Sequence, residues 1–175
     1  MEAFEILAEQ YRPMVLAYLR SVVRDAELAE DLTQESFVTA QKVLPSFQKG
    51  GNFGAWLRGI ARKKVLESRR ASRRHAIVTD SRIVAGMEDV YSSFDKLSPE
   101  HETWTERLAV LKDCVGQLGG NLRQAVDEVY EKRRTLHGAA QVLNISFDAI
   151  AQRLHRARAL LRKCVAGKTG AGSAS

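Results

Sequence analysis

Residues 136–154 read LHGAAQVLNISFDAIAQRL, which has the form of two short helices joined by a tight turn. Ala139 and Ala140 are small enough to let the two helices pack closely. Asn144 is one of the few non-glycine residues that tolerate the left-handed conformation such a turn uses. Ser146 can cap the second helix, because its hydroxyl can accept a hydrogen bond from a free backbone N–H of the first turn. The stretch therefore predicts a helix-turn-helix.

The rest of the chain is also expected to be helical. Apolar residues recur at helical spacing almost everywhere, and no stretch alternates with the period of two that marks a strand. Before the motif, the expected helices cover residues 4–23, 25–44 (with Asp25 as the cap) and 53–70. After Pro99, they cover a long segment around residues 104–115, then residues 122–130, 135–143 and 147–165. The predicted fold class is all-α.

The composition divides these helices between two small domains. Residues 77–98 are weakly periodic and acidic, and Pro99 marks a fresh start. We therefore expect a helical domain over residues 1–76, a flexible linker over 77–98, and a second helical domain with the helix-turn-helix over 99–166. The tail, residues 167–175, consists of small and polar residues and is expected to be disordered.

The formal net charge is +6, and it is distributed unevenly along the chain. Residues 56–75 carry eight basic residues against Glu67 alone, and residues 153–168 carry six with no acid. Between these blocks, residues 78–106 hold seven acids against two bases. Two basic surfaces suggest contact with a polyanion. Nucleic acid is favoured over a membrane surface, because neither block has the Trp-, Phe- and Leu-rich face that an interfacial helix inserts.

Several other classes of protein are disfavoured. No apolar run is long enough for a membrane span and the N-terminus lacks the basic start of a secretory signal, so a cytosolic location is expected. The four histidines are scattered, and neither cysteine has a partner at metal spacing, so we expect no catalytic, metal or cofactor site. Cys114 and Cys164 each lie in an apolar helical pattern, which favours buried, reduced thiols over a redox switch.

Three segments in order resemble the extracytoplasmic-function (ECF) sigma factors of bacterial RNA polymerase, and together they span nearly the whole chain. Residues 29–37, AEDLTQESF, resemble the polymerase-binding helix of sigma region 2. Phe47 and residues 53–62, FGAWLRGIAR, resemble its promoter-melting segment. Residues 140–146, AQVLNIS, and 153–158, RLHRAR, are similar to sigma region 4. The resemblance implies a non-enzymatic factor that binds core RNA polymerase and directs promoter recognition, DNA melting and transcription initiation.

The resemblance also implies roles for individual residues. The clamp of the largest polymerase subunit would meet one face of a helix, at Asp31, Gln34 and Glu35. A polar and basic set would hold the proximal promoter element: Lys49, Asn52, Arg58, Arg62, Lys63, Arg69 and Arg70. The second helix of the motif would enter the major groove of the upstream element with Phe147, Asp148, Gln152, Arg153, Arg156 and Arg158. Other surfaces of the second domain would touch the polymerase flap, and an anti-sigma factor is a further partner that the family allows.

Several alternatives stay open at the level of sequence. Phe53 and Trp56 could stack on a base, although aromatic residues at helical spacing more often fill a core. A free-standing helix-turn-helix regulator would bind duplex DNA unaided as a dimer. A protein adaptor would show no salt-dependent affinity for DNA. Lys63 and Ala151 depart from the family pattern. Lys63 favours contact with a phosphate over reading of a base, and Ala151 favours an unusual sequence preference at the upstream element.

Overall fold

The computed structural model describes residues 2–48, 50–71, 81–95 and 103–170, and these residues are mostly helical, with no strand among them. The all-α prediction is confirmed. The chain divides into two compact units. The first unit holds Met1–Thr79 and His101–Thr105, and the second holds Asp80–Glu100 and Glu106–Ser175.

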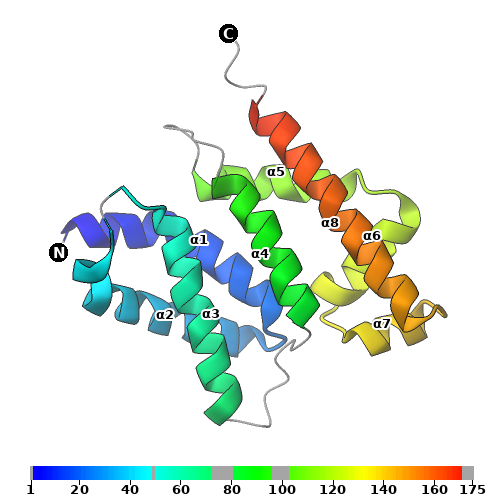
Figure 1. Ribbon diagram of the computed structural model, residues 1–175, viewed down its shortest axis with the longest axis horizontal. Coiled ribbons are helices and arrows are strands. Elements are labelled where there is room, and N and C mark those ends of the chain that lie inside the picture. Colours follow the sequence, from blue (N-terminus) through cyan, green and yellow to red (C-terminus); the bar gives the residue numbers. More distant parts are fainter. Residues whose placement is uncertain (1, 49, 72–80, 96–102, 171–175) are drawn as a thin grey trace. The chain divides into compact units, whose positions relative to one another are not determined.

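The first unit is built on three helices, α1 (Glu2–Val22), α2 (Ala26–Val43) and α3 (Phe53–Ala71), and each of them packs against the other two (Figure 1). Its core is apolar, and Tyr18 and Leu57 are fully buried within it. Asp25 caps α2 as predicted, because its Oδ1 accepts hydrogen bonds from the backbone N–H groups of Glu27 and Leu28. A short 3-10 turn, η1 (Leu44–Ser46), follows α2.

The second unit gathers around its last helix. Its elements are α4 (Ser81–Asp95), α5 (Trp104–Gly116) from Glu106 onward, α6 (Gly120–Val126), the π-helical turn η2 (Asp127–Glu131), α7 (Leu136–Val142) and α8 (Phe147–Gly170). α8 packs against α4, α6 and α7. Ile150, Leu154, Ala157 and Leu161 are buried along α8. Because they recur every three or four residues, α8 turns one continuous apolar stripe toward its neighbours.

The predicted helix-turn-helix is formed by α7 and α8. Asn144 has a φ of 51°, the left-handed conformation expected for the turn. Oγ of Ser146 accepts a hydrogen bond from the N–H of Ala149 at 3.1 Å and so caps α8. Ala139 and Ala140 are buried on α7, which packs against α8. The left-handed turn residue, the helix cap and the small buried residues that predict the motif from the sequence are therefore all present in the structure.

A helix occupies most of the expected linker. α4 spans residues 81–95 and packs on α8 within the second unit. The prediction of a flexible linker over 77–98 is therefore wrong for residues 81–95, while the rest of that range lies outside the described residues. Ile83, Val90, Tyr91 and Phe94 form the buried side of α4. Acidic residues between them dilute the apolar periodicity that marks a helix in the sequence.

Two further expectations are corrected near the C-terminus. α8 continues to Gly170, so residues 167–170 are helical and not a disordered tail, while residues 171–175 lie outside the described residues. Cys114 and Cys164 form a disulfide instead of two reduced thiols. Among the helices that the structure describes, none combines the length and the apolar character that crossing a bilayer requires.

Candidate nucleic-acid interface

The exposed side of α8 carries most of the predicted upstream contacts. Asp148, Gln152 and Arg156 are exposed and recur every four residues, so they form one row along the helix. Phe147 and Arg153 are half-buried beside this row. The row lies opposite the buried stripe of α8, and its residues follow directly after the cap of the helix. This is the part of a helix-turn-helix whose side chains reach base edges and phosphates.

Arg158 is the exception among the predicted upstream residues. Its Nη1 lies 3.4 Å from Oη of Tyr130, to which it donates a hydrogen bond. Its side chain also passes very close to Gly86 of α4, where a Cβ would lie 2.2 Å from Nε of Arg158. Arg158 is therefore engaged inside the second unit and lies away from the exposed row. The sequence did not signal this, because the partner helix α4 reads as a linker.

A second arginine of α8 also faces α4. Nη1 of Arg162 lies 4.0 Å from Oδ2 of Asp89. Between the two helices is a cleft of about 310 Å³, and Asp89, His155, Arg158 and Arg162 are among the residues that line it. The acidic helix thus lies beside part of the second basic block and offsets some of its charge. Outside this cleft, Arg156, Lys163 and Lys168 are exposed cations of α8, and the half-buried Arg153 lies beside the exposed row.

α3 carries the first basic surface. Arg62, Lys63, Arg69 and Arg70 are all exposed. Residues seven apart on a helix lie on nearly the same side and about 10 Å apart along the axis, so the four cations form two short parallel rows, Arg62 with Arg69 and Lys63 with Arg70. The structure therefore brings these four predicted contacts of the proximal element onto one solvent-facing side.

Three other predicted contacts of the proximal element are not part of this exposed basic surface. Arg58 is fully buried, with 0% of its surface exposed, so its side chain has no access to DNA in this structure. Its position in the buried row with Leu57 and Ala61 explains the burial. Asn52 is exposed, and its Oδ1 accepts a hydrogen bond at 2.8 Å from the N–H of Ala55, which gives it a capping role at the start of α3. Lys49 lies outside the described residues.

Aromatic side chains cluster where α3 begins. The ring centroids of Phe47, Phe53 and Trp56 lie between 5.1 and 5.5 Å from one another. Tyr11 of α1 joins them, with its ring 5.2 Å from that of Phe53. All four are half-buried. Phe53 and Trp56 thus pack on other rings without being fully buried, and stacking on a base stays a prediction.

The outer face of α2 carries the predicted polymerase contacts. Asp31, Gln34 and Glu35 are exposed on one side of the helix, and Val38, one turn further on, is 52% exposed. These four residues line a shallow hollow of about 510 Å³. Nζ of Lys64, on α3, lies 3.9 Å from Oε2 of Glu35. The face therefore carries two acids, polar side chains and one exposed apolar side chain, and Lys42 and Lys64 also line its hollow.

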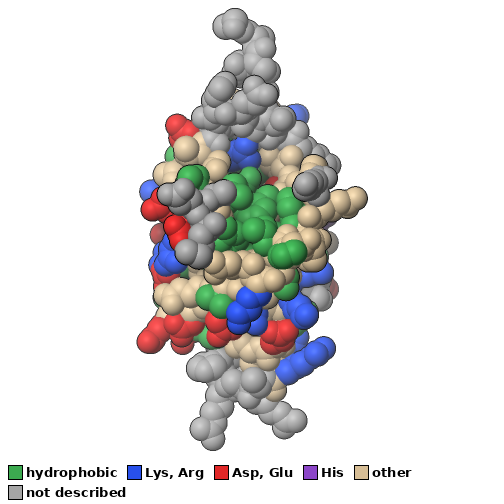
Figure 2. All heavy atoms as spheres, turned by 90° about the vertical axis from the view of Figure 1, so that its left-hand side faces the viewer, with side chains coloured by type: hydrophobic (Ala, Val, Ile, Leu, Met, Phe, Trp, Pro, Cys, Tyr) green, Lys and Arg blue, Asp and Glu red, His purple; other side chains and the backbone are tan. Residues whose placement is uncertain are grey.

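A neighbouring groove adds apolar surface to the same unit. It has a volume of about 840 Å³ and lies between α1 and α2, with Ile6, Gln34 and Phe37 among its lining residues. Ile6 is 65% exposed. Figure 2 looks onto the side of the molecule where α1 begins, and hydrophobic side chains gather there among acidic and basic ones. Apolar side chains ringed by charges are typical of a surface that binds another protein.

The turn that precedes the helix-turn-helix depends on a buried acid that the sequence analysis missed. Glu128 is 5% exposed, and its carboxylate accepts hydrogen bonds from Nζ of Lys132 at 2.6 Å and from Nε of Arg134 at 2.8 Å. The hydrogen bond from Lys132, together with that from Arg134, lowers the pKa of Glu128. Arg133, between the two cations, has a φ of 55°. The spacing of Glu128 and Lys132 by four residues was the available sequence signal.

Comparison with known proteins agrees with these features. Residues 7–75 match the family described as Sigma-70 region 2. The chain is 28% identical over 154 residues to the ECF RNA polymerase sigma factor SigM of Bacillus subtilis, which covers 88% of this chain and 90% of SigM. It is 30% identical over 157 residues to the ECF RNA polymerase sigma factor BldN of Streptomyces coelicolor, which covers 89% of this chain and 58% of BldN.

A solved structure is also similar over most of its length. The sigma factor RpoE, in its co-crystal with the anti-sigma factor NepR from Bartonella quintana, aligns over 94% of this chain and 98% of its own, with a TM-score of 0.41 and 22% identity. By these sequence matches, the chain is similar to RNA polymerase sigma factors, and residues 7–75 match sigma-70 region 2. The two relatives named above are both ECF sigma factors.

Proposed function

We propose that the chain binds core RNA polymerase through the outer face of α2 and reads a promoter with two separate basic surfaces, one on α3 and one on α8. The observation that carries this proposal is the exposure of cations on both helices, each in a different unit. A factor that contacts a promoter at two elements needs two such surfaces. Phosphate contacts by lysine and arginine supply most of the affinity for DNA.

The α2 face is suited to a protein partner. Asp31 and Glu35 offer charge to a basic surface, Gln34 offers hydrogen bonds, and Val38 offers apolar area that is free in the isolated chain. Exposed charges alone contribute little to affinity, so the apolar side chain and the adjoining groove would supply much of it. The proposed partner is the clamp of the largest subunit of the polymerase.

The first unit is proposed to hold the proximal promoter element. Arg62, Lys63, Arg69 and Arg70 would neutralise phosphates of the melted strand. The half-buried rings of Phe53 and Trp56 would offer a stacking surface for an unpaired base at the start of the same helix. Since Arg58 is buried, it serves the packing of α3 and is not part of this proposed surface.

The second unit is proposed to hold the upstream element. The row of Asp148, Gln152 and Arg156, with Arg153 beside it, would lie in the major groove while α7 crosses the backbone. The proposed unit begins with α4 instead of at residue 99, because α4 packs on α8. Another surface of this unit would meet the polymerase flap. A free-standing regulator is not favoured, because relatives that match most of the chain are RNA polymerase sigma factors.

Association with core polymerase tests the proposal at the α2 face. We expect the double substitution Asp31→Lys and Glu35→Lys to weaken binding of the chain to core polymerase by at least tenfold, measured by fluorescence anisotropy of the labelled chain. Glu131→Lys is the control, because it reverses one acidic charge, as each half of the double variant does, at an exposed position of the second unit. Equal binding by the double variant and the wild type would refute the assignment of this face.

A further inference from the structure

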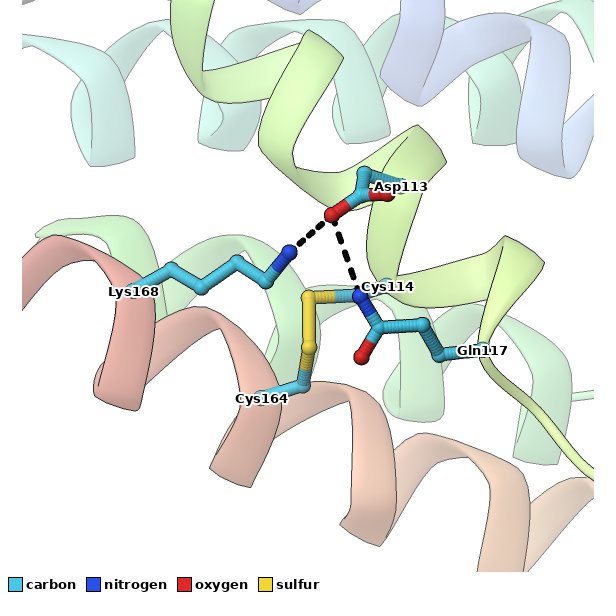
Figure 3. Close-up of a disulfide and its surroundings, with 5 residues drawn as sticks. All are labelled: Asp113, Cys114, Gln117, Cys164 and Lys168. Atoms are coloured by element: carbon cyan, nitrogen blue, oxygen red, sulfur yellow. Dashed lines mark hydrogen bonds and ion pairs between the residues drawn. A yellow bond between two sulfur atoms is a disulfide. The ribbon is translucent and has the colours of Figure 1, made fainter.

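The second unit contains a covalent bond that the sigma-factor assignment does not account for. Cys114 of α5 and Cys164 of α8 form a disulfide between residues 50 positions apart, with their Cα atoms separated by 5.9 Å (Figure 3). That separation lies within the range that an unstrained backbone allows for a disulfide. The bond closes a loop that contains α6, η2, α7 and most of α8. The turn of the helix-turn-helix and the exposed row of α8 therefore lie inside the loop.

The bond also ties α5 to the end of α8. Lys168, one turn beyond Cys164, forms an ion pair with Asp113, which is adjacent to Cys114. Nε2 of Gln117 donates a hydrogen bond to Oδ2 of the same aspartate at 3.1 Å. Figure 3 shows these side chains grouped at the disulfide. The Lys168 ion pair is half-exposed, so it is worth little by itself, and the disulfide is the stronger tie.

We propose that Cys114–Cys164 is a reversible thiol–disulfide site, and that a dithiol reductant opens it and loosens the unit that grips upstream DNA. The second half of this inference rests on the proposed role of α8. A sigma factor works beside RNA polymerase, in a compartment where cellular thiols keep most cysteines reduced. Disulfides that form in such a compartment are usually transient and redox-sensing.

The exchange begins at the more accessible sulfur. Cys114 is 1% exposed, whereas Cys164 is half-buried, so the attacking thiolate reaches Sγ of Cys164. A mixed disulfide forms there, and Cys114 leaves as a thiolate that takes a proton. The second thiol of the reductant then attacks its own sulfur in the mixed disulfide and releases Cys164. The protein gains two electrons and two protons, and the dithiol is oxidised to its own disulfide.

Opening the bond frees a long loop in the unfolded chain. For a loop of about 50 residues, the loss of the cross-link raises the unfolding equilibrium constant of the second unit by about a thousandfold. The folded unit keeps its apolar packing, so reduction makes it less stable without removing the DNA-facing row. We expect the reduced protein to direct less transcription through the upstream element, because the second unit is unfolded in a larger fraction of the molecules.

The test compares three proteins with and without dithiothreitol: the wild type, the double variant Cys114→Ser and Cys164→Ser, and Lys168→Ala. Alkylation and mass spectrometry count free thiols, urea titration measures unfolding, and promoter-directed transcription with core polymerase measures function. Lys168→Ala is the matched control, because it removes the ion pair and keeps both cysteines. We expect the wild type and Lys168→Ala to respond to reductant, and the serine variant to behave like the reduced wild type in both buffers.

Three outcomes separate the two inferences. A wild type whose cysteines both alkylate before reduction, in a glutathione buffer of oxidising ratio, overturns the disulfide site. Equal transcription in both redox states, with the expected change in unfolding, overturns the regulatory role. If neither state directs transcription although unfolding responds to dithiothreitol, the proposed function fails while the thiol–disulfide site stands.

Discussion

Removing Arg153 and Arg156 should flatten the salt dependence of promoter binding, whereas removing Arg158 should not. Arg156 is exposed on α8, and Arg153 is half-buried beside the exposed row. Arg158 is turned inward, with its guanidinium 3.4 Å from the hydroxyl of Tyr130 and packed against Gly86. The three arginines occupy one helix and carry the same charge. The difference between them therefore comes from the structure and not from composition.

The size of the effect follows from counterion release. Each phosphate contact contributes about 0.9 to the slope of the logarithm of the binding constant against the logarithm of salt concentration. Replacing Arg153 and Arg156 by alanine should thus reduce the slope by about 1.8. Between 50 and 200 mM salt, the affinity of the double variant should fall about tenfold less than that of the wild type. Arg158→Ala should leave the slope within about 0.3 of the wild type.

The assay is filter binding of the complex of core polymerase and sigma factor to a promoter fragment over a range of salt concentrations. A second fragment, in which the upstream element is scrambled, reports whether the loss belongs to that element. Two results would refute the reasoning. One is an unchanged slope for the Arg153 and Arg156 double variant, and the other is a slope for Arg158→Ala that falls as much as that of the double variant.

Three further predictions concern the second unit. Phe94→Ala should lower its free energy of unfolding by about 3–5 kcal/mol, measured by urea titration, because Phe94 of α4 is fully buried; a change below about 1 kcal/mol would show that α4 is dispensable. Gly86→Ala should change the free energy of unfolding by no more than about 1 kcal/mol, because the gain in helix propensity offsets the lost contact to the flexible side chain of Arg158. Gly86→Leu should instead lower it by about 1–3 kcal/mol, because the larger side chain overpacks the contact between α4 and α8. Glu128 has a lowered pKa in the folded chain, so its ionised form stabilises the fold. This stabilisation is complete above the ordinary glutamate pKa of about 4.3, and it is lost as the pH falls through the lower pKa of the folded chain. Glu128→Gln should therefore destabilise the protein at neutral pH and make its stability fall less between pH 5 and pH 3 in thermal melts; parallel pH profiles for variant and wild type would contradict this.

Local patterns in the sequence predicted the elements whose physical causes are local. The cap at Asp25, the left-handed Asn144 and the cap at Ser146 each depend on a few neighbouring residues, and all three are present in the structure. The class of fold followed in the same way, because helical periodicity runs along most of the chain. The exposed acidic face of α2 could also be predicted, since Asp31 and Glu35 are four residues apart on one helix.

Features that depend on distant partners could not be predicted. The sequence predicts a linker at α4, because acidic residues interrupt an apolar side that is recognisable only when α8 is placed against it. The inward turn of Arg158 depends on the missing side chain of Gly86, and nothing in the local sequence marks that contact. The burial of Arg58 was missed because its charge suggested exposure. The pairing of Cys114 with Cys164, 50 positions apart, required the relative placement of the two helices that carry them.

The central claim is that this chain directs core RNA polymerase to promoters through two DNA-binding units. Run-off transcription tests it most directly, with purified core polymerase and a library of genomic fragments from the bacterium that encodes the chain. Discrete start sites should appear only when the chain is added, and exchanging the bases of the upstream element should abolish them. If the chain fails to bind the polymerase, or if the same start sites appear without it, the account is wrong.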